Sequence, residues 1–225
     1  MIPSGTKAIF FDAVGTVLHP EPGAPTVYAR VAEINGLDAN PKTILERFRA
    51  AYLAEEKNDE GDGWRTTETR ERERWQMIVR ETLPGSSVEC FERLFEHFAK
   101  PESWAAASDA EVVFDQLAQR GFVLGLASNY DERLMQVLAG RPELKRLGNH
   151  VLISSQLGVR KPGQEFFQHI LRRVGCSPEA IVFVGDDIDN DYHGAEEAGM
   201  TAILLDPRDR HPHIPKRIRT LAELL

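Results

Sequence analysis

The chain has 225 residues, of which 42% are hydrophobic and 28% charged, and its net charge is −8 at pH 7. The length allows one large domain or two small ones. The acidic balance argues against nucleic-acid binding, which needs a basic face, but allows a small anionic substrate held by a metal. No apolar run approaches the roughly 18 residues of a membrane span. The N-terminus has no signal-peptide cleavage pattern, and Cys90 and Cys176 are expected to be reduced, so we expect a cytoplasmic protein without membrane contact.

Five short segments have the composition of buried strands. They are continuous apolar runs rather than alternating ones, as expected of strands that helices cover on both faces. Helical patterns separate the last four, which predicts an open parallel sheet built of βαβ units. The tail "IPKRIRTLAELL" predicts a final amphipathic helix. The five strand segments are residues 8–11, 122–127, 150–154, 181–185 and 201–205.

Between the first and second strands the pattern changes to helical spacing alone. Four segments show it, and no strand pattern interrupts them: "PTVYARVAEINGL", "PKTILERFRAAYLAEEK", "TRERERWQMIVRETL" and "SSVECFERLFEHFA". The stretch is too long for an ordinary loop. We therefore predict an α/β fold, a doubly wound parallel sheet with an inserted α-helical cap. The cap would span residues 17–105, and the core domain residues 1–16 and 106–225.

Polar residues follow the predicted strands at the points where they end. In an open parallel sheet, ligands bind at the carboxyl ends of the strands. We therefore expect these side chains to converge on one site. They are Asp12 after the first strand, Ser128 and Asn129 after the second, Lys161 in the loop beyond the third, and Asp186, Asp187 and Asp191 after the fourth.

Such a cluster calls for a metal ion. Asp12, Asp186 and Asp191 would repel one another when brought together. A divalent cation removes this conflict, and an oxygen-only ligand set suits Mg²⁺. The metal would attract a phosphoryl group, whose remaining oxygens Lys161 and the Ser128 hydroxyl could hold. Asp12 would then be placed as a nucleophile that forms an aspartyl-phosphate.

Four short motifs in this order resemble a known superfamily. "DAVGT", "SN", "KP" and "GDDIDND" resemble the four motifs of the haloacid dehalogenase (HAD) superfamily, and the helical insertion resembles the type-1 cap of its subfamily I. The stretches "ERERWQMIV", "SWAAASDAEVVFDQLAQRG" and "SNYDERL" look closest to the branch named HAD-like hydrolase domain-containing protein 3. The resemblance implies a Rossmann-like core and a hydrolase.

The resemblance also implies roles for individual residues. Asp12 would be the nucleophile, and Ser128 and Lys161 would hold the phosphoryl group, with Thr16 and Asn129 completing the substrate-binding residues. The Mg²⁺ cofactor would be held by Asp12, the Val14 carbonyl and Asp186. Asp191 would complete the metal site around these ligands, and Asp187 could lie there too. The expected partner is a small phosphorylated molecule, and the expected oligomeric state is a monomer or weak homodimer.

Val14 departs from the pattern of the phosphatases in this superfamily. They carry an aspartate two residues after the nucleophile, which protonates the leaving alcohol and deprotonates the attacking water. Losing such a group typically costs on the order of 10²–10⁴ in rate. Three explanations stay open: a leaving group that needs no proton, a proton from another group such as His19 or a cap residue, or a protein that binds a phosphorylated ligand with little turnover.

Two other branches of the superfamily also lack this acid. The 2-haloacid dehalogenases use no metal, and their fourth motif lacks the acidic pair seen in "GDDIDND". The phosphonoacetaldehyde hydrolases use a cap lysine as a Schiff base, but nothing around Lys42 or Lys57 marks either as desolvated. We therefore rank metal-dependent phosphatase first, phosphate-binding protein second, and C–halogen or C–P hydrolase third.

Other polar segments favour structural interpretations. The run "RERER" at 70–74 is typical of a solvated helix face with weak Arg–Glu pairing. Asn129, with Glu132 three residues on, fits the cap of a following helix. Trp64, Trp75 and Trp104 are expected in core or hinge packing rather than on the substrate.

Overall fold

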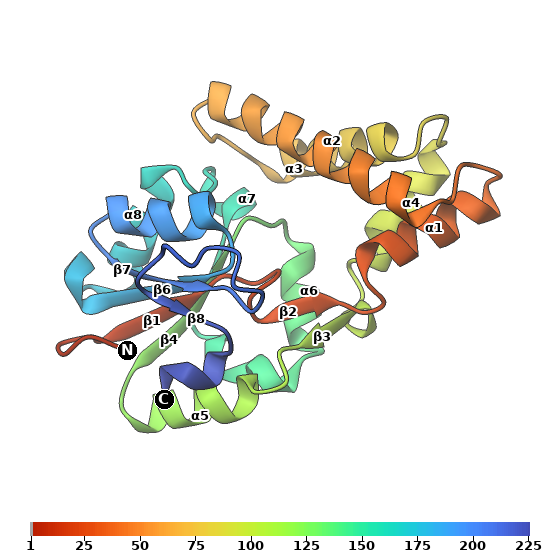
Figure 1. Ribbon diagram of the computed structural model, residues 1–225. Helices are drawn as coiled ribbons and strands as arrows, with labels where there is room; N and C mark the ends of the chain where they lie inside the picture. Colours follow the sequence, from red (N-terminus) through yellow and green to blue (C-terminus); the bar gives the residue numbers. More distant parts are fainter. Residues whose placement is uncertain (1) are drawn as a thin grey trace.

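Six parallel strands form the central sheet of the computed structural model, which describes residues 2–225. The strand order is β5–β4–β1–β6–β7–β8 (Figure 1). This order confirms the predicted doubly wound α/β fold. The strands are β1 (Ala8–Phe11), β4 (Val123–Ser128), β5 (Val151–Ile153), β6 (Ile181–Gly185), β7 (Thr201–Leu205) and β8 (Arg217–Ile218).

Both faces of the sheet are covered, which explains the continuous apolar runs. In β1, Ile9 and Phe11 pack into one core cluster together with Phe114 of α5 (Ala110–Gln119). Ala8 and Phe10 pack into the other, which includes side chains of α8 (Gln164–Val174). Successive side chains of a strand point to opposite faces, so a strand between two helical layers is apolar at every position. Three further short helices belong to this domain: α6 (Arg133–Ala139), α7 (Ser154–Leu157) and α9 (Gly194–Glu197).

The predicted helix at the C-terminal tail is wrong. Residues 217–218 form β8 instead, pairing with Leu204 and Leu205 of β7. The remaining tail forms only a 3₁₀ turn, Leu221–Leu224, closed by a capping box at Thr220. Leu221 and Leu224 are both buried, so the three-residue spacing that predicted a helix is satisfied by this single turn.

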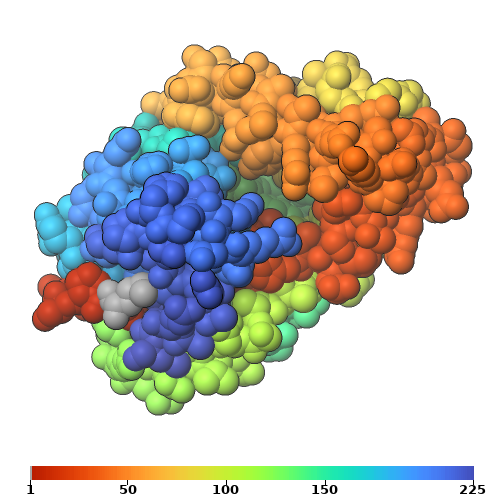
Figure 2. Space-filling view, viewed as in Figure 1, coloured from red at the N-terminus to blue at the C-terminus, as the bar shows by residue number. Residues whose placement is uncertain are grey.

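Four helices form the insertion between β1 and the rest of the sheet. They are α1 (Ala24–Ile34), α2 (Pro41–Gly61), α3 (Glu68–Thr82) and α4 (Val88–His97), and they correspond to the four predicted helical segments. They share an apolar cluster of their own that includes Val27, Ile44 and Leu94. The antiparallel pair β2 (Leu18–Pro20) and β3 (Trp104–Ala106) joins them to the sheet. Figure 2 shows these helices overhanging the sheet, with a hollow between. The boundaries of a separate cap domain at residues 17 and 105 stay a prediction.

A buried ion network ties these cap helices to the core. Asp59 of α2 accepts from Nε of Arg74 on α3 at 2.8 Å, and lies 3.5 Å from Nε of Arg160 in the core. Arg160 also pairs with Glu71. These four side chains are at most 3% exposed. Arg70 extends the network to Asp59 at 2.8 Å.

The interpretation of residues 70–74 as a solvated face is therefore wrong for Arg70 and Arg74. It is also wrong for the buried Glu71, whereas Arg72, with a side chain 46% exposed, and the exposed Glu73 fit it. Acidic partners on α2 explain the difference, since burying a guanidinium requires paired charges.

In the part of the chain that the structure describes, no helix is both long and apolar enough to cross a membrane.

Candidate active site

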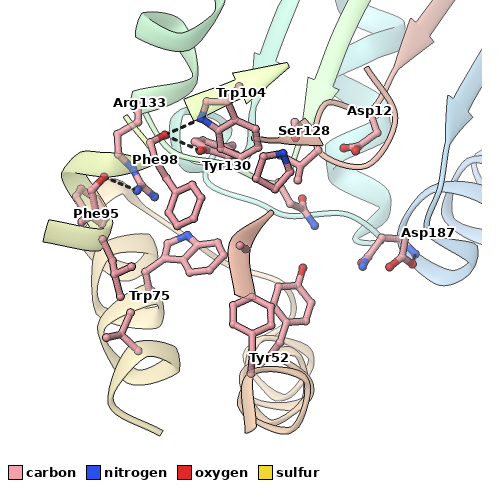
Figure 3. A pocket seen from close by; sticks show the side chains of 18 of the residues that line it. Asp12, Tyr52, Trp75, Phe95, Phe98, Trp104, Ser128, Tyr130, Arg133 and Asp187 are labelled. Carbon is pink, nitrogen blue, oxygen red and sulfur yellow. Dashed lines mark hydrogen bonds between the residues drawn. The ribbon is translucent and has the colours of Figure 1, made fainter. Parts of the chain in front are cut away.

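The carboxyl ends of the parallel strands bring the predicted residues together. Asp12 directly follows β1, and its backbone N–H donates to Val184 of β6 at 2.8 Å. Ser128 is the last residue of β4, and Asp186 directly follows β6. Asp12, Ser128 and Lys161 are all less than 10% exposed and line one cavity. Figure 3 shows Asp12, Ser128 and Asp187 at its core side.

Three carboxylates converge with one ammonium. Asp12, Asp186 and Asp191 each offer an oxygen within 4.8 Å of the others. Lys161 Nζ donates to Asp12 Oδ1 and to Asp191 Oδ1, both at 2.6 Å. Burial, followed by the nearby charges of Asp12 and Asp187, raises the pKa of Asp186 to about 7. Burial also raises the pKa of Asp191. Fully ionised, the three carboxylates would carry more negative charge than one lysine neutralises, and the raised pKa values of Asp186 and Asp191 express this conflict.

Two glycines make this convergence sterically possible. A Cβ at Gly15 would lie 2.4 Å from both carboxylate oxygens of Asp186, and Gly15 has a φ of +96°, which disfavours a side chain. A Cβ at Gly185 would lie 2.2 Å from Asp191 Oδ2. The chain thus leaves out side chains where the carboxylates gather. Three carboxylates with only oxygen donors fit a hard divalent cation such as Mg²⁺.

A π-helical turn positions Asp191. Asp187 Oδ1 caps this turn, Ile188–His193, by accepting from the N–H groups of Asp189 at 2.9 Å and Asn190 at 2.8 Å. The turn directs Asp191 back to the strand end, where its Oδ2 accepts from the Asp187 N–H at 3.1 Å. Asp187 therefore acts on the carboxylate cluster in two ways: its backbone N–H fixes Asp191, and its carboxylate caps the turn and adds negative charge near Asp186.

Asn129 and Thr16 both position other site residues. Asn129 donates to the Lys161 carbonyl at 2.9 Å and accepts from the Lys161 N–H at 2.8 Å, so it fixes the loop that carries the lysine. Its predicted role as a helix cap is wrong, because α6 begins at Arg133 with Glu132 as N-cap. Thr16 is fully buried, and its hydroxyl donates to Asp186 Oδ1 at 3.2 Å. We therefore expect Thr16 to orient Asp186 rather than to contact substrate.

The cavity above these residues has a volume of about 330 Å³ and is lined from both the core and the cap. Val14 lines it and is 37% exposed, so a side chain at this position faces the cavity. His19 lies on β2, outside the set of residues that line the cavity. Lys42 and Lys57 are exposed and also lie outside that set. None of these three is placed to supply a proton or a Schiff base.

Sequence reasoning missed Arg133 and its partner Asp131. The guanidinium of Arg133 donates to both carboxylate oxygens of Asp131, at 2.7 and 2.6 Å. It also donates to the Phe95 carbonyl at 3.1 Å (Figure 3). It lies 3.5 Å from the centroid of the Phe95 ring. A signal was available, because "YDERL" places an acid and an arginine two residues apart beside the second motif.

Comparison with known proteins agrees with this geometry. Residues 6–199 match the family described as haloacid dehalogenase-like hydrolase. The human "Haloacid dehalogenase-like hydrolase domain-containing protein 3" is 30% identical over 234 residues, covering 97% of this chain and 92% of its own. A solved "HAD phosphatase from Thermococcus onnurineus" is 26% identical with a TM-score of 0.68, covering 97% and 96% of the two chains. The solved "L-2-Haloacid Dehalogenase RSc1362" has a TM-score of 0.76 and covers 97% and 96% of the two chains. At 18% sequence identity, this similarity shows a shared fold only.

Proposed function

This chain belongs to the haloacid dehalogenase-like hydrolases, and from that premise we propose that it is a Mg²⁺-dependent phosphatase. Its substrate would be a small phosphorylated molecule, hydrolysed in the cytoplasm by a monomer or weak homodimer through an aspartyl-phosphate on Asp12. The observation that carries the proposal is the carboxylate cluster, whose ligand oxygens lie within 4.8 Å of one another. Three acids with a single lysine are electrostatically hard to explain for metal-free chemistry.

The site residues would have three roles: holding the cation, holding the phosphoryl group and attacking phosphorus. Asp12, Asp186, Asp191 and the Val14 carbonyl would hold the cation, which when bound withdraws charge from the phosphoryl oxygens. Lys161 and Ser128 would hold the remaining phosphoryl oxygens. A free Asp12 oxygen then attacks phosphorus, and the bond from phosphorus to the leaving oxygen breaks. Water subsequently attacks the aspartyl-phosphate, regenerating the Asp12 carboxylate and releasing phosphate.

The test is hydrolysis of 4-nitrophenyl phosphate with Mg²⁺ by the wild type and by Asp12→Asn. Nitrophenolate leaves without a proton, so this substrate does not need the acid that Val14 replaces. We expect wild-type turnover and a loss on the order of 10³-fold or more in the variant. Asp62→Asn, at an exposed position of the cap, is the matched control and should keep full activity.

Two outcomes would overturn the proposal. One is tight binding of phosphate or vanadate with no turnover of any phosphate ester, which would indicate a phosphate-binding protein. The other is metal-independent chloride release from 2-chloropropionate, which would indicate a dehalogenase. The second outcome is less expected because Arg133, which lines the cavity, is already paired with Asp131 and is not free to bind a substrate carboxylate.

A further inference from the structure

Aromatic side chains form most of the cap side of the cavity. Their rings follow one another at short distances: Trp75 to Phe48 at 6.5 Å, Phe48 to Tyr28 at 5.6 Å and Tyr28 to Phe98 at 6.4 Å between centroids. The row continues into the β2–β3 connection through Trp104, 5.8 Å from Phe98. Figure 3 shows Tyr52, Trp75, Phe95, Phe98 and Trp104 around the same space. We call this set the aromatic wall: Tyr28, Phe48, Tyr52, Trp75, Phe95, Phe98, Trp104 and Tyr130.

The cap rings are only partly used by packing within the cap. Phe48, Tyr52, Trp75, Phe95 and Phe98 all keep partial exposure while lining the cavity. Aromatic faces that stay exposed inside a concave site offer stacking and edge-to-face contacts to a ligand. The sequence-based expectation of packing holds for Trp104, which is 5% exposed in the core cluster, and for Trp75, which packs against the cap cluster. Both also line the cavity, which that expectation did not include.

The polar atoms near the inner end of the wall already have partners inside the protein. Trp104 Nε1 and the Tyr130 hydroxyl both donate to the Phe98 carbonyl, at 3.1 and 3.2 Å (Figure 3). Arg133 is occupied by Asp131 and the Phe95 carbonyl. At this inner end of the wall, a charged or sugar-like group would lose water without gaining a partner from Trp104, Tyr130 or Arg133, which is costly. This end of the wall therefore favours an uncharged ring.

We propose that the substrate is an aryl phosphate, an ester of phosphate with a phenol. This inference rests on the proposed phosphatase function and adds the substrate class to it. Two independent features point the same way. The aromatic wall accepts the ring, and Val14 supplies no proton, which suits a phenolate that leaves as an anion. A cavity of about 330 Å³ lies at the small end of ligand pockets and suits a ligand of one or two rings.

The reaction balances without a general acid. An Asp12 oxygen forms a bond to phosphorus as the bond from phosphorus to the aryl oxygen breaks, and the phenolate keeps the electron pair. Water then adds to phosphorus, the bond between phosphorus and Asp12 breaks, and both water protons leave on the phosphate as H₂PO₄⁻. The phenolate takes its proton from solvent after release.

Three substrates separate the contributions of ring and leaving group. 4-Nitrophenyl phosphate has both a ring and a good leaving group, acetyl phosphate has only the good leaving group, and 3-phenylpropyl phosphate has only the ring. We expect kcat/KM for the nitrophenyl ester to exceed that for acetyl phosphate by about tenfold, the size of one or two ring contacts. For the phenylpropyl ester we expect a deficit of about 10²-fold or more, because its alkoxide needs a proton.

Variants of the wall locate the effect. Trp75→Leu and, independently, Phe48→Leu should lower kcat/KM for the nitrophenyl ester about tenfold, mainly through KM. Both should leave acetyl phosphate within about twofold, which shows that the fold and the chemistry survive. The matched control is Phe122→Leu, because Phe122 is a partly buried aromatic residue of the core domain outside the cavity. It should leave kcat/KM unchanged for both substrates.

The outcomes distinguish this inference from the proposed function. Equal kcat/KM for acetyl and nitrophenyl phosphate, with no selective effect of either wall variant, would overturn the aryl assignment while the phosphatase stands. If none of the three substrates is hydrolysed, the proposed function is overturned, and this inference with it.

Discussion

The core and the cap place their functional side chains in different ways. In the core, Asp12, Ser128 and Asp186 each occupy the end of a strand or the next position, so the parallel sheet itself brings them together. In the cap, the rings of the aromatic wall come from α1, α2, α3 and α4, and they form one surface only because these helices pack together. The type of reaction is therefore readable from the order of a few residues, whereas substrate preference depends on how four helices pack.

The two regions also hold charge differently. The core site gathers three carboxylates around one lysine, so without a cation it can avoid excess negative charge only by binding protons. The network between cap and core pairs Asp59 and Glu71 with Arg74 and Arg160 in a space closed to solvent. The carboxylate cluster of the core site suits binding of a cation, and the paired network suits attachment of the cap helices to the core.

The largest effect is expected from the charge network. Arg160→Met removes the guanidinium from Glu71 and Asp59 and leaves buried charge uncompensated, so we expect the free energy of unfolding to fall by about 3–5 kcal/mol. Urea unfolding of the metal-free protein measures it. The control is Arg65→Met, whose exposed pair with Glu165 should contribute about 0–1 kcal/mol. Equal losses in the two variants would mean that the network does not hold the cap to the core.

A smaller effect is expected from restoring an acid at the position of Val14. Val14→Asp places a carboxyl group where a side chain already faces the cavity. We expect kcat for 3-phenylpropyl phosphate to rise about tenfold to 10²-fold, because the alkoxide can then leave protonated. The nitrophenyl ester, which needs no proton, should change far less. An equal gain on both esters would show that the leaving group does not limit the wild type.

The smallest effect is expected from the cation and pH. The pKa of Asp186 is raised from 3.8 to about 7 in the folded, metal-free protein. The folded state therefore keeps a proton that the unfolded chain loses near pH 4, so metal-free stability decreases as pH rises from about 4 to 7. A bound cation should reverse this loss, by up to about 2.7 kcal/mol at 100 times its Kd.

Thermal unfolding at pH 6 and pH 8, with and without Mg²⁺, checks this expectation. The stabilisation should be larger at pH 8, because Asp186 must lose its proton to act as a ligand. Asp186→Asn should remove most of it, whereas Asp62→Asn should not. A Mg²⁺ effect that is unchanged in Asp186→Asn would place the cation elsewhere.

The sequence predicted those parts of the molecule that depend on local order. The five sheet strands were recognisable because burial on both faces makes every position apolar. The acids after β1 and β6 were recognisable because strand ends meet at one edge. Most of the interactions that were missed join residues far apart in the chain, such as Asp59 with Arg160 and Trp75 with Phe48. The Asp131–Arg133 pair is local, and its burial, which depends on the fold, was missed. At the C-terminal tail a local pattern predicted a helix that does not form, because an amphipathic pattern of leucines fits a 3₁₀ turn as well as a longer helix.

Arg160 and Lys161 are neighbours in the chain that serve the two regions separately. One peptide bond joins the residue that neutralises cap acids to the residue that contacts Asp12. This adjacency limits protein engineering by domain exchange. A foreign cap without counterparts of Asp59 and Glu71 would leave an isolated cation beside the reactive lysine. Chimeras that aim at new substrates should therefore transfer those two acids together with the helices, or replace Arg160 by an apolar residue in the recipient.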